Sequence, residues 1–247
     1  MKKKQNIMGM PITVCVCDKN ITSKDIAEIF SYFHHIDKKF STYKNESEIS
    51  KINRGQLKEE DYSKEMKKIF ELSEKTKKET KGYFDIKFKN KIDPSGIVKG
   101  FAIWEASKIL KNKGYKNFYI EAGGDIQVFG NNQEGNTWKV GIKNPFNVKE
   151  VIKVLNLTNK GIATSGTYIK GKHIYNPKSK KFADEIASIT VMGKNIYEAD
   201  RFATAAFAMG EKGINFISSL KGFEGYMIKK DKKAVFTKGF RKYAENN

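Results

Sequence analysis

Segments with helical periodicity alternate irregularly with short β-type runs along this chain, and that order limits the folds open to it. Apolar residues at helical spacing predict helices over residues 23–39, 63–80, 99–113, 196–209 and 212–220. Runs of β-branched and aromatic residues predict strands over residues 12–16, 118–121, 126–129, 138–142, 151–157, 187–192, 226–229 and 235–237. Because these segments do not follow a strict strand–helix–strand rhythm, a mixed α+β fold is favoured over a doubly wound sheet.

The chain is long enough to bury a sizeable core, with 247 residues of which 39% are hydrophobic. No repeat, low-complexity segment or linker divides it, so we expect a single domain over residues 1–247. No run approaches the roughly 18 apolar residues of a membrane helix, so we expect no membrane span. Lys2, Lys3 and Lys4 give the chain a basic start, but Gly9 and Pro11 break the apolar run that follows, so we expect no export signal. Cys15 and Cys17 are too close on a predicted strand for an ordinary disulfide, which indicates reduced thiols and a cytoplasmic location.

The formal net charge is +19, from 47 Lys and Arg against 28 Asp and Glu. Such a charge attracts polyanions, so a nucleic-acid binder is one possible class. The lysines are scattered, however, and no nucleic-acid-binding motif frames them. A lysine-rich solvated surface is therefore favoured over a nucleic-acid partner, and the same field would also favour a small phosphate-bearing ligand.

The sharpest local signal is an Asp–Thr pair in the predicted helix 196–209. Asp200 and Thr204 are four residues apart, so their oxygens project from one helical face. A carboxylate and a hydroxyl on one face suit Mg²⁺, which keeps its other positions for water and substrate phosphate. The alternative is a solvated Asp and a Thr that bonds back to its own helix.

Two glycine-bearing turns could hold an anion. Residues 120–126 join two predicted strands, and Gly123 and Gly124 remove side chains so that backbone amides can approach a ligand. Residues 93–100 lead into a predicted helix, whose N-terminus suits a phosphate. Each could equally be a hairpin turn or a helix cap, and neither matches a Walker A or dinucleotide fingerprint.

A third turn is predicted at residues 163–167, which contain Thr164, Ser165 and Gly166. Clustered hydroxyls near His173 suggest phosphate contacts and a proton carrier, while an ordinary polar hairpin with a structural histidine is the alternative. No nucleophile elbow, zinc-ligand spacing or paired catalytic cysteine is present.

Taken in order, these segments resemble the ApbE family of FAD:protein FMN transferases along nearly the whole chain. The motifs that carry the resemblance are Met8-Gly9-Met10-Pro11, Phe40-Ser41-Thr42-Tyr43, Ser47-Glu48-Ile49-Ser50 with Asn53, Gly82-Tyr83-Phe84-Asp85-Ile86, residues 93–100 with Lys99-Gly100, Ala122-Gly123-Gly124-Asp125, Thr164-Ser165-Gly166, His173-Ile174 with Pro177, and Ala199-Asp200 with Thr204.

The resemblance implies an α+β fold of two intimately packed lobes with FAD in a cleft between them and Mg²⁺ on its pyrophosphate. Metal ligands would be Asp200, Thr204 and the backbone carbonyl near Gly96. His173 and Asp200 would be catalytic. Contacts to FAD would come from Met8, Ser41, Tyr43, Lys99, Glu121, Gly123, Gly124, Asp125, Thr164, Ser165, Gly166 and His173.

The implied reaction is attack of a threonine hydroxyl of an acceptor redox protein on the FMN-side phosphorus of FAD, with AMP leaving. Two positions depart from the family: Asn176 stands where many members have Asp, and Trp104 where they have an acidic residue. Two alternatives stay open, an FAD pyrophosphatase that uses water as nucleophile and a non-catalytic FAD-binding protein. Neither the acceptor's identity nor the oligomeric state follows from the sequence.

Overall fold

An eight-stranded sheet organises the molecule in the computed structural model, which describes residues 1–167, 171 and 174–245. Its strands pair antiparallel in the order β1-β2-β5-β6-β9-β12-β13-β14. These are β1 (Lys2–Ile7), β2 (Met10–Val16), β5 (Phe118–Ala122), β6 (Asp125–Phe129), β9 (Lys160–Gly166), β12 (Ile186–Gly193), β13 (Glu224–Lys229) and β14 (Ala234–Phe236).

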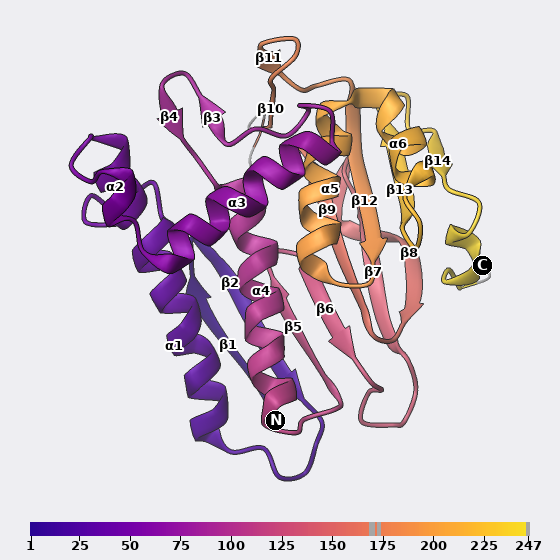
Figure 1. Ribbon diagram of the computed structural model, residues 1–247. Helices are drawn as coiled ribbons and strands as arrows, with labels where there is room; N and C mark the ends of the chain where they lie inside the picture. Colours follow the sequence, from indigo (N-terminus) through magenta and orange to yellow (C-terminus); the bar gives the residue numbers. More distant parts are fainter. Residues whose placement is uncertain (168–170, 172–173, 246–247) are drawn as a thin grey trace.

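Helices cover one face of this sheet (Figure 1). All five predicted helices are confirmed, although their ends shift, as α1 (Ser23–Phe40), α3 (Lys64–Glu79), α4 (Ser95–Asn112), α5 (Ile196–Ala208) and α6 (Gly213–Ser219). The Thr22–Asp25 capping box at the start of α1 is present. A short helix, α2 (Glu48–Asn53), was not predicted. The mixed α+β prediction is therefore confirmed.

The opposite face of the sheet is covered by a hairpin of β7 (Trp138–Asn144) and β8 (Asn147–Leu157), which form their own two-stranded sheet. Two hydrophobic clusters result, a larger one under the helices and a smaller one under the hairpin. Within β6, Phe129 lies in the first and Val128 in the second, because alternate residues of a strand face opposite sides. Two further hairpins, β3 (Lys87–Phe88) with β4 (Lys91–Ile92) and β10 (Tyr175–Asn176) with β11 (Lys181–Phe182), project beyond the sheet.

Among the described residues, no helix combines the length and the apolar character that a membrane crossing requires. Cys15 and Cys17 are both free thiols. The single-domain assignment of residues 1–247 stays a prediction.

Two strands of the main sheet were missed. β1 is polar, and its first five residues are exposed because it is an edge strand. β9 includes residues 160–166, so the prediction of a turn at 163–167 is wrong. The glycine and hydroxyl residues of β9 look like a turn, but Gly161 is needed in the strand because α5 approaches closely: a Cβ at Gly161 would lie 2.0 Å from the Ile196 nitrogen.

Candidate functional site

Three charged side chains from α4, β6 and α5 converge beneath the helices. The Lys99 Nζ lies 2.5 Å from Asp125 Oδ2 and 3.7 Å from Asp200 Oδ1. Asp125 is 1% exposed and Asp200 3% exposed, whereas the side chain of Lys99 keeps 26% of its surface accessible. We call these three residues the charged cluster. They were predicted separately as ligand contacts, and the structure brings them together.

Close packing of α4 against α5 positions Asp200. Gly96 and Gly100 lie four residues apart on α4, and they face Thr204 and Asp200, which have the same spacing on α5. A Cβ at Gly100 would lie 2.7 Å from the Asp200 Cβ, and one at Gly96 would lie 3.3 Å from the Thr204 Cγ2. The two glycines therefore let the helices approach until the acidic side chain reaches the backbone of α4.

The expected turn at residues 93–100 is wrong in part, because α4 begins at Ser95 and not at Lys99. Pro94 is the N-cap of α4, and the Asp93 carboxylate accepts a hydrogen bond of 3.0 Å from the Ser95 amide. The glycines lowered the helical signal because glycine has poor helix propensity. Gly96 and Lys99 accordingly lie in the first two turns of the helix.

Backbone amides hold both carboxylates. The Gly100 amide donates to Asp200 Oδ2 at 2.8 Å, and the Thr164 amide donates to Asp125 Oδ1 at 3.1 Å. Asp125 Oδ2 is buried and faces the Lys99 ammonium, but no hydrogen bond satisfies it within the part of the chain that the structure describes. The cluster thus presents a carboxylate oxygen that has only an ionic partner.

The charges in the cluster do not cancel. One ammonium faces two carboxylates, which leaves a formal charge of −1 when all three groups are ionised. Burial raises the pKa of Asp200 to about 7; Lys99 opposes this shift and the nearby Asp125 adds to it. Burial acts to lower the pKa of Lys99, but Asp125 and Asp200 outweigh it and raise that pKa above its ordinary value. Lys99 therefore remains charged, while Asp200 can exchange a proton near neutral pH.

The oxygen donors beside the cluster fit Mg²⁺ better than a softer metal. Asp200 offers a carboxylate, partly exposed Thr204 offers a hydroxyl from the same face of α5, and Gly96 lies opposite with its backbone partly exposed. Among residues 1–167, 171 and 174–245, the Thr204 hydroxyl has no hydrogen bond and no group of three His, Cys, Asp or Glu forms a metal site. A site of this composition would leave several positions of the ion to water and substrate phosphate. The assignment of Gly96, Asp200 and Thr204 as ligands stays a prediction.

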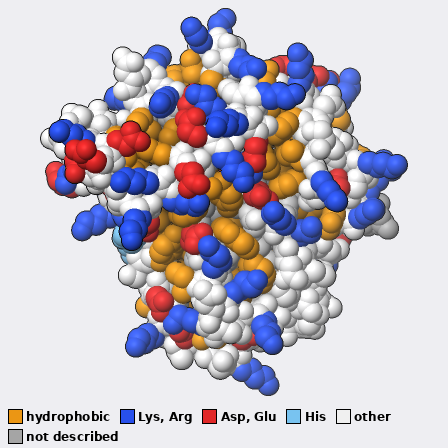
Figure 2. Space-filling view, viewed as in Figure 1, with side chains coloured by type: hydrophobic (Ala, Val, Ile, Leu, Met, Phe, Trp, Pro, Cys, Tyr) orange, Lys and Arg blue, Asp and Glu red, His pale blue; other side chains and the backbone are white. Residues whose placement is uncertain are grey.

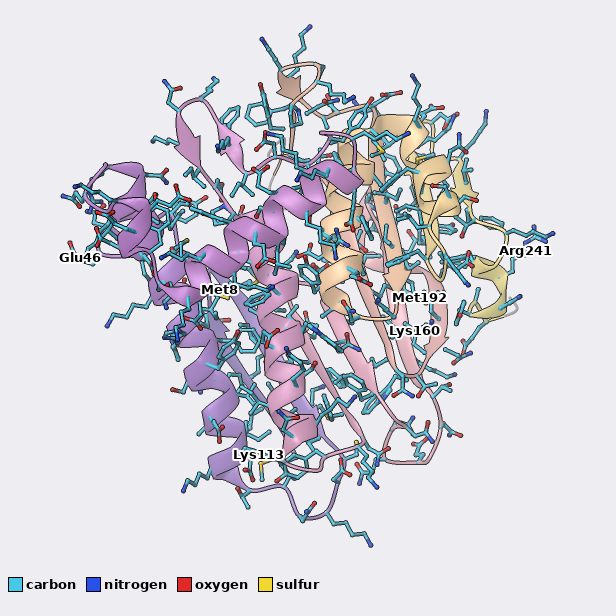
Figure 3. The ribbon with its side chains drawn as sticks, in the orientation of Figure 1. Met8, Glu46, Lys113, Lys160, Met192 and Arg241 are labelled. Atoms are coloured by element: carbon cyan, nitrogen blue, oxygen red, sulfur yellow. The ribbon has the colours of Figure 1, made fainter. Side chains whose placement is uncertain are left out.

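Two tight hairpin turns lie next to each other at one end of the sheet. Met8, labelled in Figure 3, and Gly9 connect β1 to β2, while Gly123 and Gly124 connect β5 to β6. All four have positive φ, between 58° and 96°, as type I′ turns require. The Gly123 amide donates to the Pro11 carbonyl and the Gly124 amide to Glu121 Oε1. Both amides proposed to approach an anion are thus already bonded within the protein.

The hydroxyls of β9 are divided between the two faces of the sheet. Thr164 Oγ1 lies 2.8 Å from Thr190 Oγ1 on the neighbouring strand, so this hydroxyl is engaged. Ser165 is buried and faces the other side, because side chains alternate along a strand. Gly166 ends β9 opposite Ser188. Of Thr164, Ser165 and Gly166, only Thr164 bonds to the charged cluster, because its amide donates to Asp125.

The remaining predicted ligand contacts lie in the loop that follows α1 or outside the described residues. Tyr43, in the loop between α1 and α2, is 97% exposed, which is unusual for a large aromatic side chain. Ser41 caps α1, and its carbonyl accepts a hydrogen bond of 2.7 Å from the Ser47 hydroxyl. His173 lies outside the described residues.

The two positions that depart from the family have structural partners. Asn176 donates from Nδ2 to the Ala208 carbonyl at 2.8 Å, and its Oδ1 accepts amide hydrogen bonds within its own hairpin. Trp104 stacks on Phe129, with ring centroids 6.1 Å apart.

A second buried charge was missed by the sequence analysis. The guanidinium of Arg201 bonds to Glu79 and to the Thr76 hydroxyl of α3, and Glu198 Oε1 lies 3.9 Å away. Arg201 follows Asp200 directly, so this contact fixes the turn of α5 that carries the acid. The available signal was a second charged residue next to Asp200 in the run of mostly small and apolar residues 199–208.

The sequence model of the ApbE family matches residues 8–91 and 87–227. The FAD:protein FMN transferase of Haemophilus influenzae is 30% identical over 171 residues, which are 62% of this chain and 49% of that protein. The Escherichia coli enzyme of the same name is 26% identical over 150 residues, covering 57% of this chain and 43% of that protein. The chain thus spans about half the length of these curated relatives.

Solved structures agree over nearly the whole chain. The flavin transferase ApbE from Vibrio cholerae superposes with a TM-score of 0.85 at 21% identity, covering 98% of each chain. The ApbE protein of Thermotoga maritima gives a TM-score of 0.87 at 22% identity, covering 100% of this chain and 99% of that one. At these identities the structures establish the fold, and the match of the family model along most of the sequence establishes descent. The chain belongs to the ApbE family.

Proposed function

We propose that this chain is a transferase that moves FMN from FAD to a threonine hydroxyl of an acceptor redox protein and releases AMP. The observation that carries the proposal is the charged cluster beside Thr204 and Gly96: a buried, net anionic set of hard oxygen donors with one fixed ammonium. Such a set suits a divalent cation and a pyrophosphate. The relatives named FAD:protein FMN transferase support the same reaction.

In this reaction the threonine Oγ forms a bond to the FMN-side phosphorus, and the bond from that phosphorus to the bridging oxygen breaks. The bridging oxygen leaves with AMP. Bound Mg²⁺, held by Asp200, Thr204 and the Gly96 carbonyl, would neutralise charge on the pyrophosphate oxygens. Lys99 adds a positive charge whose position is fixed by two carboxylates. Tyr43 offers an exposed ring against which the flavin can stack.

The threonine proton needs an acceptor. Asp200 is one candidate on sequence grounds; the pKa of about 7 that burial gives it belongs to the cation-free site, and a bound Mg²⁺ would lower it. His173 is the second candidate on sequence grounds. The free thiols of Cys15 and Cys17 fit the reducing cytoplasm in which we expect the reaction.

The test is incubation of the protein with FAD and Mg²⁺, with and without a candidate acceptor domain. We expect an FMN-mass adduct on an acceptor threonine and little free FMN without acceptor. Rapid release of free FMN without acceptor would favour the FAD pyrophosphatase, and FAD binding without turnover would favour a non-catalytic flavoprotein. Asp200→Ala should abolish turnover. Glu74→Ala, which removes an exposed carboxylate on α3, is the matched control.

A further inference from the structure

Two hairpins that project beyond the sheet form one continuous surface. The Phe88 ring of β3 contacts Tyr175 of β10 and Phe182 of β11, with centroid distances of 4.4 and 5.8 Å. Residues 82–92 contain one hairpin and residues 174–183 contain the other. The aromatic contact therefore joins two segments that are far apart in the sequence, since Phe88 and Tyr175 are separated by 87 positions. We call these two segments the hairpin surface. Figure 1 shows both hairpins at the same end of the molecule as the start of α4.

The hairpin surface carries unneutralised positive charge. Its six lysines are all exposed, and none has a carboxylate partner among the described residues: Lys87, Lys89, Lys91, Lys178, Lys180 and Lys181. Asp85, the only acidic residue in the two segments, is paired with Lys77 at 2.6 Å. Some lysines elsewhere are paired, as Lys113 is with Asp25 and Glu28. Figure 2 shows lysine and arginine side chains projecting along this edge.

The aromatic side chains favour a polypeptide over a nucleic acid as the occupant. Phe182 is 46% exposed and offers apolar surface between the lysines. The Tyr175 ring meets Phe88 at 60° and Phe182 at 78°, so the rings pack edge to face against one another. Bases of a single-stranded nucleic acid need free ring faces on which to stack. A peptide with acidic and apolar side chains can use both the lysines and the exposed ring edge.

The hairpin surface is anchored to both helices that form the charged cluster. Asn176 of β10 bonds to the carbonyl of Ala208 at the end of α5, one turn beyond Thr204. Phe84, which precedes β3, packs against Gly96, where a Cβ would lie 3.2 Å from its ring. A protein held on this surface is thus held beside the site where FMN would be transferred.

We infer that the hairpin surface docks an acidic segment of the acceptor protein and so presents the target threonine to the charged cluster. This inference rests on the proposed function for the identity of the partner. Clustered charge of one sign speeds encounter with a partner of opposite sign and is weakened by salt.

The experiment uses two synthetic peptides, one with a threonine flanked by Asp and Glu and one with the same length and Gln in place of each acid. The variant Lys87→Gln/Lys89→Gln/Lys181→Gln is compared with wild type and with the control Lys143→Gln/Lys149→Gln/Lys153→Gln, which lies on the β7–β8 hairpin. Peptide affinity is measured by fluorescence anisotropy, FMN transfer by mass spectrometry, and FAD affinity by quenching of flavin fluorescence.

We expect the hairpin-surface variant to bind the acidic peptide about tenfold more weakly, with the Gln peptide and FAD affinity unchanged and the control variant like wild type. Equal affinity of the variant and wild type for the acidic peptide would overturn the inference. A parallel loss of FAD affinity would also overturn it, because the lysines would then serve the flavin substrate. Unchanged peptide binding together with lost binding of a 20-nucleotide DNA would assign the surface to a nucleic acid instead. Charge-dependent peptide binding with no FMN adduct would refute the proposed transfer reaction while leaving the docking surface standing.

Discussion

Replacement of Asp200 by asparagine should change the free energy of unfolding and the FMN transfer activity in opposite directions. The amide oxygen of Asn has the same position as a carboxylate oxygen, so it can accept the 2.8 Å hydrogen bond from Gly100. The substitution removes one negative charge from a residue that is 3% exposed. The Lys99–Asp125 pair, at 2.5 Å, would then be neutral overall.

The expected gain in stability follows from the raised pKa. The pKa of Asp200 moves from 3.8 to about 7 on folding, because the site is buried and Asp125 is close. Between these values the folded protein keeps a proton that the unfolded chain has released, so stability falls as pH rises through this window. Each pKa unit corresponds to about 1.36 kcal/mol, so the full penalty above pH 7 is about 4 kcal/mol. Asp200→Asn should therefore be more stable than wild type by about 4 kcal/mol at pH 8 and by less than half of that at pH 5.

The measurement is urea denaturation at pH 5 and pH 8 in the presence of a chelator, since a bound cation would also neutralise Asp200. Asp61→Asn removes an exposed carboxylate and should change stability little at either pH. The same Asp200→Asn protein should lose FMN transfer. An Asp200→Asn protein that is equally or less stable than wild type at pH 8 would show that Lys99 fully compensates the buried charge, and the argument from desolvation would be wrong.

Three further predictions test the packing and the edges of the site. Gly100→Ala should lower stability by about 1–3 kcal/mol and impair transfer, because its Cβ would meet the Ile196 carbonyl oxygen at 2.9 Å; Gly96→Ala, with a nearest contact of 3.2 Å to a side chain, should cost less in urea denaturation. Tyr43→Ala should leave the denaturation midpoint unchanged and raise KM for FAD, since the ring is exposed and has no packing to lose; an unchanged KM would remove Tyr43 from the flavin site. Glu79→Gln should destabilise the protein by about 1–3 kcal/mol, because the buried guanidinium of Arg201 loses its nearest carboxylate, and a midpoint equal to that of wild type would contradict this.

Local patterns were enough to predict the helices and part of the site. Asp200 and Thr204 were paired correctly on one face because a helix fixes its own i, i+4 neighbours. Gly123 and Gly124 were expected in a tight turn, and both have positive φ in the hairpin that places Asp125 at the start of β6. Each of these features depends on a few adjacent residues.

The contacts that assemble the site are not local. Gly100 and Asp200 are 100 residues apart, and nothing in either segment specifies that α4 and α5 pack so closely. The same approach explains the missed strand, since β9 needs small residues against α5 and small residues mimic a turn. The i, i+4 spacing of Gly96 and Gly100 was readable as a helix-packing face, but it was interpreted as a phosphate-binding turn.

The charged cluster lowers the stability of the fold, and this loss of stability indicates that the cluster serves to bind a ligand. Two buried carboxylates share one ammonium, and Asp125 Oδ2 lacks any hydrogen bond within the described residues. A neutral residue at position 200 would relieve the excess negative charge, as the predicted stability of Asp200→Asn expresses. A divalent cation would change the formal charge of the cluster from −1 to +1, which is the sign that a pyrophosphate requires. The excess charge therefore makes physical sense as one half of a ligand site, and the gain in stability of Asp200→Asn should disappear when Mg²⁺ and FAD are added to wild type.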